Sequence, residues 1–525
     1  MQILLGMTLC VLAVPAMADR TIDTHDPNRT ATIFVHGFDS DGAEMSGIFG
    51  QDVEEPLLIT VASMGGLPAN DGGQSLPPSV VTATTYYGDT PPSYYTAQDI
   101  AEVDQVTKQW GGGIPRYALI VAKYARHVMD RSGAQQVNFV SASMGTFVTR
   151  WLIENDSAGL VSDGQVARWL SLEGVLAGNW AASNGLLSGL WDMFGTPPID
   201  VDQMNYGWVD ANVHSPRTET DSPAYADILV GMEVSTRDAA NDGALSDIML
   251  LEDDFKANDG VQAVDDAYFH WMAPQSRFLG QSHSMTWFHV DHYELADHGP
   301  GMAQIVNFMT QRRRVMAVVT RLQVTDIHEP DDWWWDWTPA EIVIESEVYS
   351  PQVEALWGIA GSMCTRGVEG VSSPMYAFGS NGDQLMMDHV VYDDFLAEGE
   401  TTLTIEIGGF EIDWNDKYGI QEPIGDGDAM GETSIAIDVS QAGTFTQEFS
   451  ASDFNGTLEV RVLDYPFKVL DEVSPGDVDG NGVVDVSDLL AVINAWGPCS
   501  SCGEDLDHSG MVDVSDLLIV IANWS

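Results

Sequence analysis

Apolar and polar residues follow different patterns along this chain, and each pattern marks a different part. Before residue 313, short β-branched or apolar runs are separated by segments whose apolar residues recur every three to four positions. One such segment, residues 114–136, predicts an amphipathic helix that ends at a glycine-containing turn. Strands that alternate with helices predict an α/β fold, with a mostly parallel sheet and helices on both faces.

The pattern changes in residues 314–470, where β-rich runs recur with acidic turns and little helical spacing. Such runs predict an antiparallel β-sandwich. The runs are residues 317–327, 340–349, 402–412, 433–439 and 458–465.

The last part, residues 471–525, contains an internal repeat. The segment 476–496 recurs at 504–524 with nearly the same aspartates, glycine and apolar residues. Each copy has short polar or acidic side chains at the ligand positions of a twelve-residue calcium loop of EF-hand type, and a glycine at the sharp turn. The predicted ligands, with Val483 and Met511 acting through their carbonyls, are Asp477, Asp479, Asn481, Val483, Asp485 and Asp488 in the first copy and Asp505, Asp507, Ser509, Met511, Asp513 and Asp516 in the second.

An aspartate at loop position twelve and a single helix per loop depart from true EF-hands, and the repeat resembles a type I dockerin. The resemblance implies a small α-helical domain with two Ca²⁺ sites. It also implies a cohesin-type protein partner or an anchor to the cell surface. No cofactor is expected to take part in the chemistry of the rest of the chain.

The main chemical signal is the segment VNFVSASMGTFVTRWL, residues 137–152. A β-branched and aromatic run breaks at Ser-Ala-Ser-Met-Gly and resumes as an apolar helical pattern. This order predicts a nucleophile elbow, in which Ser143 stands on a tight strand-to-helix turn. Small residues must flank such a serine at two positions on each side. Gly145 meets this requirement, and Ser141 replaces the usual first glycine of G-x-S-x-G with another small residue.

A second block precedes the elbow. Residues 32–42, TIFVHGFDSDG, predict a strand that ends at His36-Gly37. A turn at this place offers the backbone N–H of Phe38 as an oxyanion donor, with the N–H of Met144 as the second donor.

Together these blocks, within residues 30 to about 310, resemble a secreted lipase or esterase of the α/β-hydrolase superfamily. The resemblance implies a catalytic triad in the chain order serine, acid, histidine. The expected acid is Asp242, in an Asn-Asp-Gly turn after the predicted strand 229–234, and Asp238 and Asp247 are alternatives.

The expected base is His292, in a His-x-Glu-Leu sequence before the last helical pattern of residues 288–309. His298 and His289 are alternatives, because the sequence does not say which histidine faces Ser143.

Residues 178–228 are rich in glycine, asparagine, tryptophan and proline, and they predict an insertion over the site, either a lid or an acyl pocket. Core packing is the more ordinary role for its apolar residues at roughly helical spacing, which are Trp180, Leu186, Leu187, Leu190, Trp191 and Phe194.

Composition bounds the compartment and the partners. With 79 acidic and 21 basic residues, the formal charge of −58 argues against nucleic acid and anionic membranes as electrostatic partners.

An apolar N-terminal run with an Ala16-x-Ala18 exit predicts a signal peptide over residues 1–18 and therefore secretion. No later stretch is long and apolar enough to be expected to span a bilayer. Cys499 and Cys502 could form a small disulfide, and Cys364 would be a buried thiol.

The expected domains are therefore a catalytic domain at 19–313, a β-sandwich at 314–470 and a dockerin-like domain at 471–525. The expected function is that of a secreted serine hydrolase that cleaves carboxylic esters of lipids or polymer-associated compounds. One alternative is an amidase or acyltransferase on the same fold, and another is a non-catalytic, calcium-dependent adhesion or scaffold protein.

Overall fold

The computed structural model of the chain forms two compact units, Met1–Pro466 and Phe467–Ser525, which are described separately. The residues that the structure describes are 26, 28–38, 76–184, 198–214, 222–235, 259–263, 266–269, 283–288, 299–327, 340–349, 375–397, 399–411, 414–416, 421–423, 428–464, 476, 478, 484, 486–498, 506 and 511–524. The predicted signal peptide and the cysteines Cys364, Cys499 and Cys502 lie outside them.

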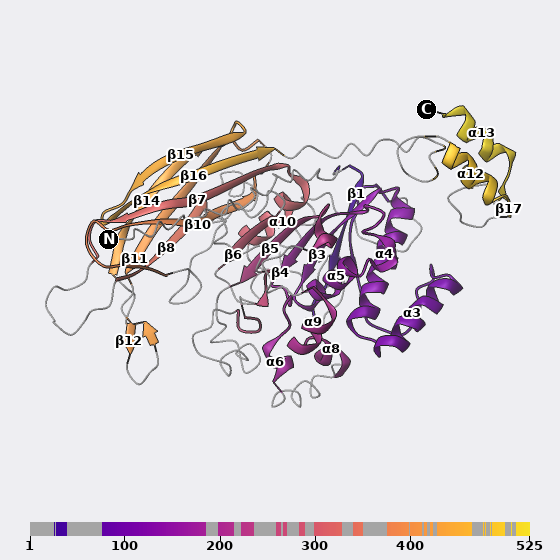
Figure 1. The fold of residues 1–525 in the computed structure, drawn as a ribbon, viewed down its shortest axis with the longest axis horizontal. Coiled ribbons are helices and arrows are strands. Elements are labelled where there is room, and N and C mark those ends of the chain that lie inside the picture. Colours follow the sequence, from indigo (N-terminus) through magenta and orange to yellow (C-terminus); the bar gives the residue numbers. More distant parts are fainter. Residues whose placement is uncertain are drawn as a thin grey trace, which may run out of the picture. The chain divides into compact units, whose positions relative to one another are not determined.

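The first half of the larger unit is built on a six-stranded sheet in the order β2-β1-β3-β4-β5-β6 (Figure 1). Every neighbouring pair of strands is parallel. Its strands are β1 (Thr30–Val35), β2 (Val81–Thr84), β3 (Gln136–Ala142), β4 (Val166–Leu172), β5 (Leu229–Ser235) and β6 (His283–Phe288).

Helices pack against both faces of this sheet. The helices α4 (Ile114–Ser132) and α5 (Met144–Glu154) share one apolar core with alternate residues of the strands, such as Phe139. On the other face, residues of α10 (Gly299–Thr310) share a core with the intervening strand residues, such as Val140. The predicted α/β architecture, a parallel sheet with helices on both faces, is confirmed.

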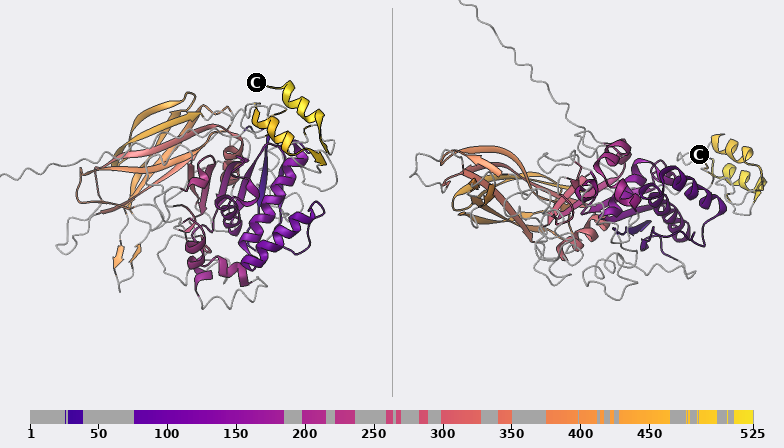
Figure 2. Two further views of the ribbon diagram at one scale, coloured as in Figure 1. Left: turned by 45° about the vertical axis from the view of Figure 1, so that its right-hand side comes forward. Right: turned by 90° about the horizontal axis from the view of Figure 1, so that it is seen from below.

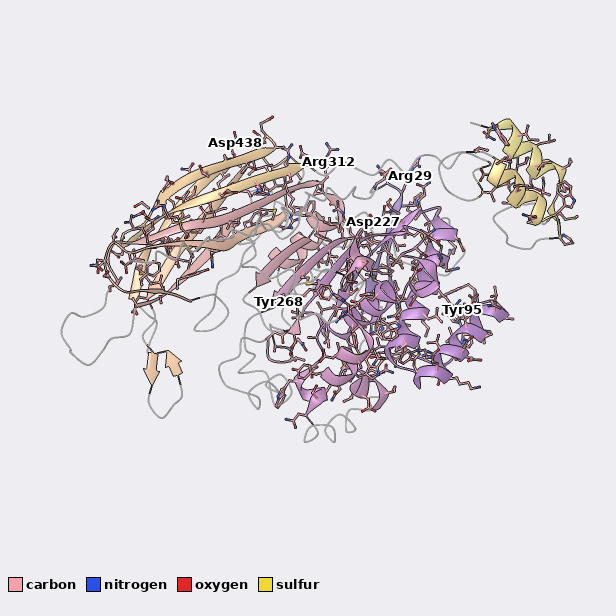
Figure 3. The ribbon with its side chains drawn as sticks, in the orientation of Figure 1. Arg29, Tyr95, Asp227, Tyr268, Arg312 and Asp438 are labelled. Carbon is pink, nitrogen blue, oxygen red and sulfur yellow. The ribbon has the colours of Figure 1, made fainter. Side chains whose placement is uncertain are left out.

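The carboxyl ends of parallel strands meet at one edge of the sheet, and loops leaving that edge can converge. Arg29 and Asp227, labelled in Figure 3, precede β1 and β5 and mark the opposite, amino edge. Tyr268, also labelled, lies toward the carboxyl edge, in a segment where the Asp266 carbonyl accepts from the N–H groups of Leu176 and Ala177 just after β4.

The helix α3 (Ala97–Trp110) was not predicted from the apolar pattern, because none of its residues is fully buried. Its ends carry local signals instead. Thr96 and Asp99 form a capping box at the start, and Gly111 ends the helix with φ 79°. Lys123 of α4 holds the helix in place through ion pairs with Asp99 at 2.5 Å and Glu102 at 2.6 Å.

Residues 313–464 are antiparallel, as predicted, and form two four-stranded sheets in the orders β10-β7-β16-β15 and β14-β11-β8-β9. Burial alternates along the strands, as in β16, because one face of each sheet meets a common core. The strands are β7 (Arg313–Val324), β8 (Ala340–Tyr349), β9 (Met375–Phe378), β10 (Gln384–Phe395), β11 (Thr402–Glu411), β14 (Asp428–Asp438), β15 (Gly443–Ser450) and β16 (Phe454–Asp464), with a small hairpin of β12 (Trp414–Asp416) and β13 (Gln421–Pro423).

Two long strands of this part were not predicted, for physical reasons that the structure shows. Along β10, register shifts occur between Met386 and His389 and between Val390 and Tyr392, and they interrupt the two-residue alternation. The strand β15 lies at a sheet edge with most of its residues exposed, so it carries no apolar stripe.

A buried arginine ties the parallel sheet to α10 and to the antiparallel part. Arg168 on β4 donates to the carbonyl oxygens of Phe308 and Gln311, the latter at 2.8 Å, at the end of α10. Its guanidinium also lies 5.0 Å from the centre of the Phe395 ring on β10. A cation at this end of a helix satisfies terminal carbonyls and opposes the helix dipole.

Among its described residues, the C-terminal unit has two short helices, α12 (Val486–Asn494) and α13 (Val514–Ala522), seen in yellow in Figure 2. A two-residue ladder of β17 (Gly497–Pro498) and β18 (Met511–Val512) joins the segments between them. The core of this unit consists of the valines Val484, Val492, Val512 and Val520. Within the described residues, no helix combines the length and the apolar character that crossing a membrane requires.

Candidate active site

Ser143 occupies the sharp turn between β3 and α5. Its backbone has φ 51° and ψ −125°, a combination that residues with a Cβ rarely adopt. Hydrogen bonds hold it there: Ser143 N donates to Leu172 O at 2.9 Å, and Ser143 O accepts from Thr146 Oγ1 at 2.6 Å. Backbone strain of this kind costs about 1–3 kcal/mol and clusters at functional sites. The local backbone is that of a strand-to-helix elbow with a serine at its tip.

The residues that flank Ser143 explain the S-x-S-x-G form of the motif. A Cβ on Gly145 would lie 2.3 Å from His36 O and 2.6 Å from Val35 O, so glycine is required where α5 meets the end of β1. Ser141 is buried, and its hydroxyl accepts from the Thr149 hydroxyl of α5 at 2.9 Å. A serine is therefore tolerated at the position of the usual glycine, because the helix satisfies its polar atom.

The predicted oxyanion turn lies directly against Ser143. A Cβ added to Gly37 would stand 3.0 Å from Ser143 Cβ and 3.6 Å from Ser143 Oγ. Phe38 follows this glycine, and Met144 is the first residue of α5, where a backbone N–H has no acceptor within the helix. The structure thus brings together both predicted donor residues and the predicted nucleophile.

A buried ion pair anchors the C-terminal half of helix α5. Arg150 Nε lies 2.8 Å from Glu154 Oε1, and the guanidinium also donates to the carbonyls of Leu176 and His214. Glu154 in turn accepts from the Tyr225 hydroxyl at 2.9 Å. Because these groups satisfy one another, the pair fixes α5 to the segments at both ends of the predicted insertion.

The predicted insertion is described in three pieces, which contain α6 (Trp180–Ser183), α8 (Pro198–Gln203) and α9 (Tyr206–Asn212). Gln203 is buried, and its side chain accepts from Ile114 N at 2.6 Å at the start of α4. This part of the insertion is therefore packed against the start of α4, beside the parallel sheet. Of the predicted apolar stripe, Trp180 lies in α6 and Leu186, Leu187, Leu190, Trp191 and Phe194 lie outside the described residues.

A second residue of α8, Asp200, is fully buried beside three tyrosines. Its Oδ2 accepts from the Tyr117 hydroxyl at 3.2 Å, and no described residue hydrogen-bonds to its Oδ1. The rings of Tyr86 and Tyr87 lie 4.9 and 5.3 Å from that of Tyr117. Burial, opposed by the Tyr117 hydrogen bond and the charge of Arg116, raises the pKa of Asp200 to about 6.

Two buried carboxylates at the same edge of the sheet were not predicted. Glu173 has φ 49° and directly follows Leu172, the last residue of β4 and the partner of Ala142 in the register with β3. The second carboxylate is Glu233 on β5. Burial raises the pKa of Glu233 well above its ordinary value, and the charges of Asp394 and Glu173 raise it further. No described residue hydrogen-bonds to the Glu233 carboxylate. The sequence signal that could have found them is an acidic residue at the end of an apolar run, Glu173 after residues 166–172 and Glu233 within residues 229–234.

In the sequence, the predicted acid follows β5, which ends at Ser235, and the predicted base follows β6, which ends at Phe288. The residues themselves, Asp242 with its alternatives Asp238 and Asp247 and His292 with its alternatives His298 and His289, lie outside the described residues.

In the C-terminal unit, four of the predicted calcium ligands are described: Asp488, Met511, Asp513 and Asp516. The two position-twelve residues make equivalent contacts. Asp488 Oδ1 accepts from Val478 N at 2.7 Å, and Asp516 Oδ1 accepts from Leu506 N at 2.7 Å. Both carboxylates are buried and face the start of their own loop. Among described residues no three acidic, histidine or cysteine side chains gather as a metal site, and the ligands Asp477, Asp479, Asn481, Val483, Asp485, Asp505, Asp507 and Ser509 lie outside them.

No protein-family model matches this chain, and no curated protein matches its sequence. Among solved structures, the mature lipase BlEst2 of Bacillus licheniformis is 14% identical over 55% of this chain and 95% of its own, with a TM-score of 0.36. The phospholipase PlaB of Legionella pneumophila is 11% identical over 73% of this chain and 85% of its own, with a TM-score of 0.35. A metagenomic carboxyl esterase is 13% identical over 52% of this chain and 67% of its own, with a TM-score of 0.32. At scores this low, we take the fold from the strand order and the elbow of this chain itself.

The buried Asp200 makes stability depend on pH. Asp200 titrates near 3.8 when unfolded and near 6 when folded, so folding disfavours the ionised form. Its contribution to stability is therefore lost as the pH rises from about 4 to 6 and is constant above that. We expect Asp200→Asn to raise the free energy of unfolding by up to about 3 kcal/mol at pH 8 and to change it little at pH 4.

Urea unfolding of the full chain at both pH values measures this difference. Asp202→Asn, at an exposed position of the same helix, is the matched control. An effect of Asp200→Asn that is equal at pH 4 and pH 8 would contradict the raised pKa.

Proposed function

We propose that this protein is a secreted carboxylic ester hydrolase that works through an acyl-enzyme on Ser143. The observation that carries the proposal is the strained backbone of Ser143 at the carboxyl edge of a parallel sheet, in contact with the His36-Gly37 turn. Ser143 is half-buried at the tip of this turn. A serine hydroxyl needs such a tightly held position because it is a weak nucleophile without a base and oxyanion donors beside it.

In the proposed reaction, His292 accepts the proton of Ser143 as Oγ bonds to the acyl carbon. Asp242 fixes the orientation and tautomer of the imidazole, and the N–H groups of Phe38 and Met144 bind the oxyanion. The bond to the alcohol then breaks, and the histidine gives the proton to the leaving alkoxide. Water attacks the acyl-enzyme by the reverse proton route and releases the acid.

Two features support an enzyme over an adhesion protein. Backbone strain such as that of Ser143 clusters at functional sites, and the contact at Gly145, which only glycine can make, brings the first turn of α5 against the end of β1. Amide hydrolysis or acyl transfer would use the same groups, and esters remain our proposal because they need the least leaving-group activation. We propose lipid or polymer-associated esters as substrates and export through the leader at residues 1–18.

We further propose that the C-terminal unit binds two Ca²⁺ ions and docks a cohesin-type protein or a cell-surface anchor. The all-oxygen donor set suits Ca²⁺, and the buried Asp488 and Asp516 already face their loops. Eight apolar residues are 45–58% exposed, in two equivalent sets: Val486, Leu490, Ile493 and Trp496 with α12, and Val514, Leu518, Ile521 and Trp524 with α13. Paired stripes of this kind are typical of protein-binding faces.

The nucleophile is tested with a fluorophosphonate probe, which forms a stable adduct only with an activated serine. We expect stoichiometric labelling of the full chain at Ser143, located by mass spectrometry of the tagged peptide, and none in Ser143→Ala. Labelling of a different serine, or no labelling of folded protein, would show that the proposed function is wrong.

The acid is tested by neutral, isosteric substitutions of two carboxylates, the predicted Asp242 and the buried Glu173. We expect Asp242→Asn to lower kcat on a p-nitrophenyl ester by about 10³–10⁴-fold, because the imidazole loses its orienting partner. Glu173→Gln is the matched control and should cost much less. If Glu173→Gln causes the larger loss of kcat, the triad uses Glu173 instead.

The calcium sites are tested on the full chain by removing the ion. We expect EDTA to expose residues 467–525 to limited proteolysis and excess Ca²⁺ to restore protection, because loop folding is coupled to metal binding. The double variant Asp488→Ala/Asp516→Ala should be cleaved with or without Ca²⁺. Identical cleavage patterns of the unchanged protein in EDTA and Ca²⁺ would refute this proposal.

A further inference from the structure

The oxyanion turn is held from behind by side chains that the mechanism above does not use. The single proton of the Tyr86 hydroxyl is shared between two carbonyl oxygens of this turn, His36 O at 2.8 Å and Gly37 O at 3.0 Å. The ring nitrogen His36 Nδ1 lies 2.8 Å from the same Gly37 O. Since a carbonyl oxygen only accepts, Nδ1 carries the proton. Gly37 O thus accepts hydrogen bonds from two donors, the Tyr86 hydroxyl and His36 Nδ1.

The hydrogen bonds to Gly37 O also fix the direction of the backbone N–H of Phe38. The carbonyl of Gly37 and the N–H of Phe38 belong to one peptide unit, and no described peptide bond is cis. In a trans peptide the two groups point in opposite directions. Fixing the carbonyl toward Tyr86 and His36 therefore fixes the direction of the Phe38 N–H away from them. Ser143 lies against the same glycine: a Cβ added to Gly37 would stand 3.6 Å from Ser143 Oγ.

From this geometry we infer that Tyr86 and His36 are positioning residues, which hold the Phe38 N–H in the direction needed to bind the oxyanion on Ser143. The inference rests on the proposed function, since it assigns a role in the same reaction. It gives the histidine of the His-Gly turn a role distinct from that of the base.

The surroundings keep both donors in their hydrogen-bonding state. Tyr86 and His36 are fully buried, and their rings stack at 4.0 Å with an angle of 10° between the planes. Burial, and then the neighbouring Tyr87, Asp200 and Tyr117, raises the pKa of Tyr86 well above its ordinary value, so its hydroxyl keeps the proton. The other ring nitrogen, His36 Nε2, lies 3.3 Å from the Thr85 hydroxyl.

Loss of a positioning residue should lower kcat more than it changes KM. An oxyanion donor acts on the transition state far more than on the bound ester, and its loss costs about 10²–10³-fold in kcat. If the donor is kept but its direction is no longer fixed, the loss of kcat should be smaller. We therefore expect Tyr86→Phe, which keeps the stacked ring and removes the hydroxyl, to lower kcat about 10–100-fold and to change KM less than about threefold.

The experiment measures kcat and KM on a p-nitrophenyl ester with the full chain, together with the rate of fluorophosphonate labelling. Tyr124→Phe is the matched control, because the Tyr124 hydroxyl lies 2.7 Å from a side-chain hydroxyl on β2, Thr82 Oγ1. Loss of kcat in Tyr86→Phe alone, at similar urea midpoints, supports the inference. Equal kinetics of the two variants overturns it.

A second pair of variants decides the matter if Tyr86→Phe does not fold. The amide nitrogen of His36→Asn overlays Nδ1 and can still donate to Gly37 O, whereas His36→Leu cannot. We expect kcat of His36→Asn to exceed that of His36→Leu by at least about tenfold, and equal values would overturn the inference. If wild-type Ser143 is not labelled, the proposed function fails; if it is labelled and these variants do not differ, only the positioning role fails.

Discussion

The close approach of α5 to the end of β1 is the constraint on which the site depends. Gly145 lets the first turn of the helix rest against the carbonyl oxygens of Val35 and His36, where any Cβ would collide. This contact sets where Ser143 stands and how near the His36-Gly37 turn comes to it. The strain in the Ser143 backbone is tolerated because hydrogen bonds from both sides, to Leu172 and from Thr146, leave the turn no relaxed alternative.

Buried polar side chains then make the surrounding elements rigid. Arg150 and Glu154 hold α5 to the segments that flank the insertion, and Arg168 ties β4 to the end of α10 and to the antiparallel part. Each of these arginines donates to backbone carbonyl oxygens. Buried charges of this kind specify one arrangement, because a displaced neighbour would leave a desolvated cation without acceptors. Loops that carry chemistry need such a frame beneath them.

Much of the catalytic fold could be predicted because its strands and helices bury continuous apolar faces. The elbow was visible from residue types alone, since a β-branched run, small residues and an apolar helix follow one another around Ser143. Helix α3 and strand β15 could not be found in this way, because they are exposed and carry no buried stripe. The roles of Tyr86, Asp200 and Glu173 depend on contacts between segments far apart in the chain, which no local pattern encodes.

The proposed reaction requires that Ser143 attack a carbonyl whose oxygen is bound by the backbone N–H groups of Phe38 and Met144. A crystal structure of the chain with a phosphonate ester bonded to Ser143 tests it most directly, because the phosphoryl oxygen stands in for the oxyanion. We expect that oxygen to lie about 2.7–3.1 Å from both backbone nitrogens. A phosphoryl oxygen that faces solvent, with both nitrogens beyond hydrogen-bonding distance, would contradict the account.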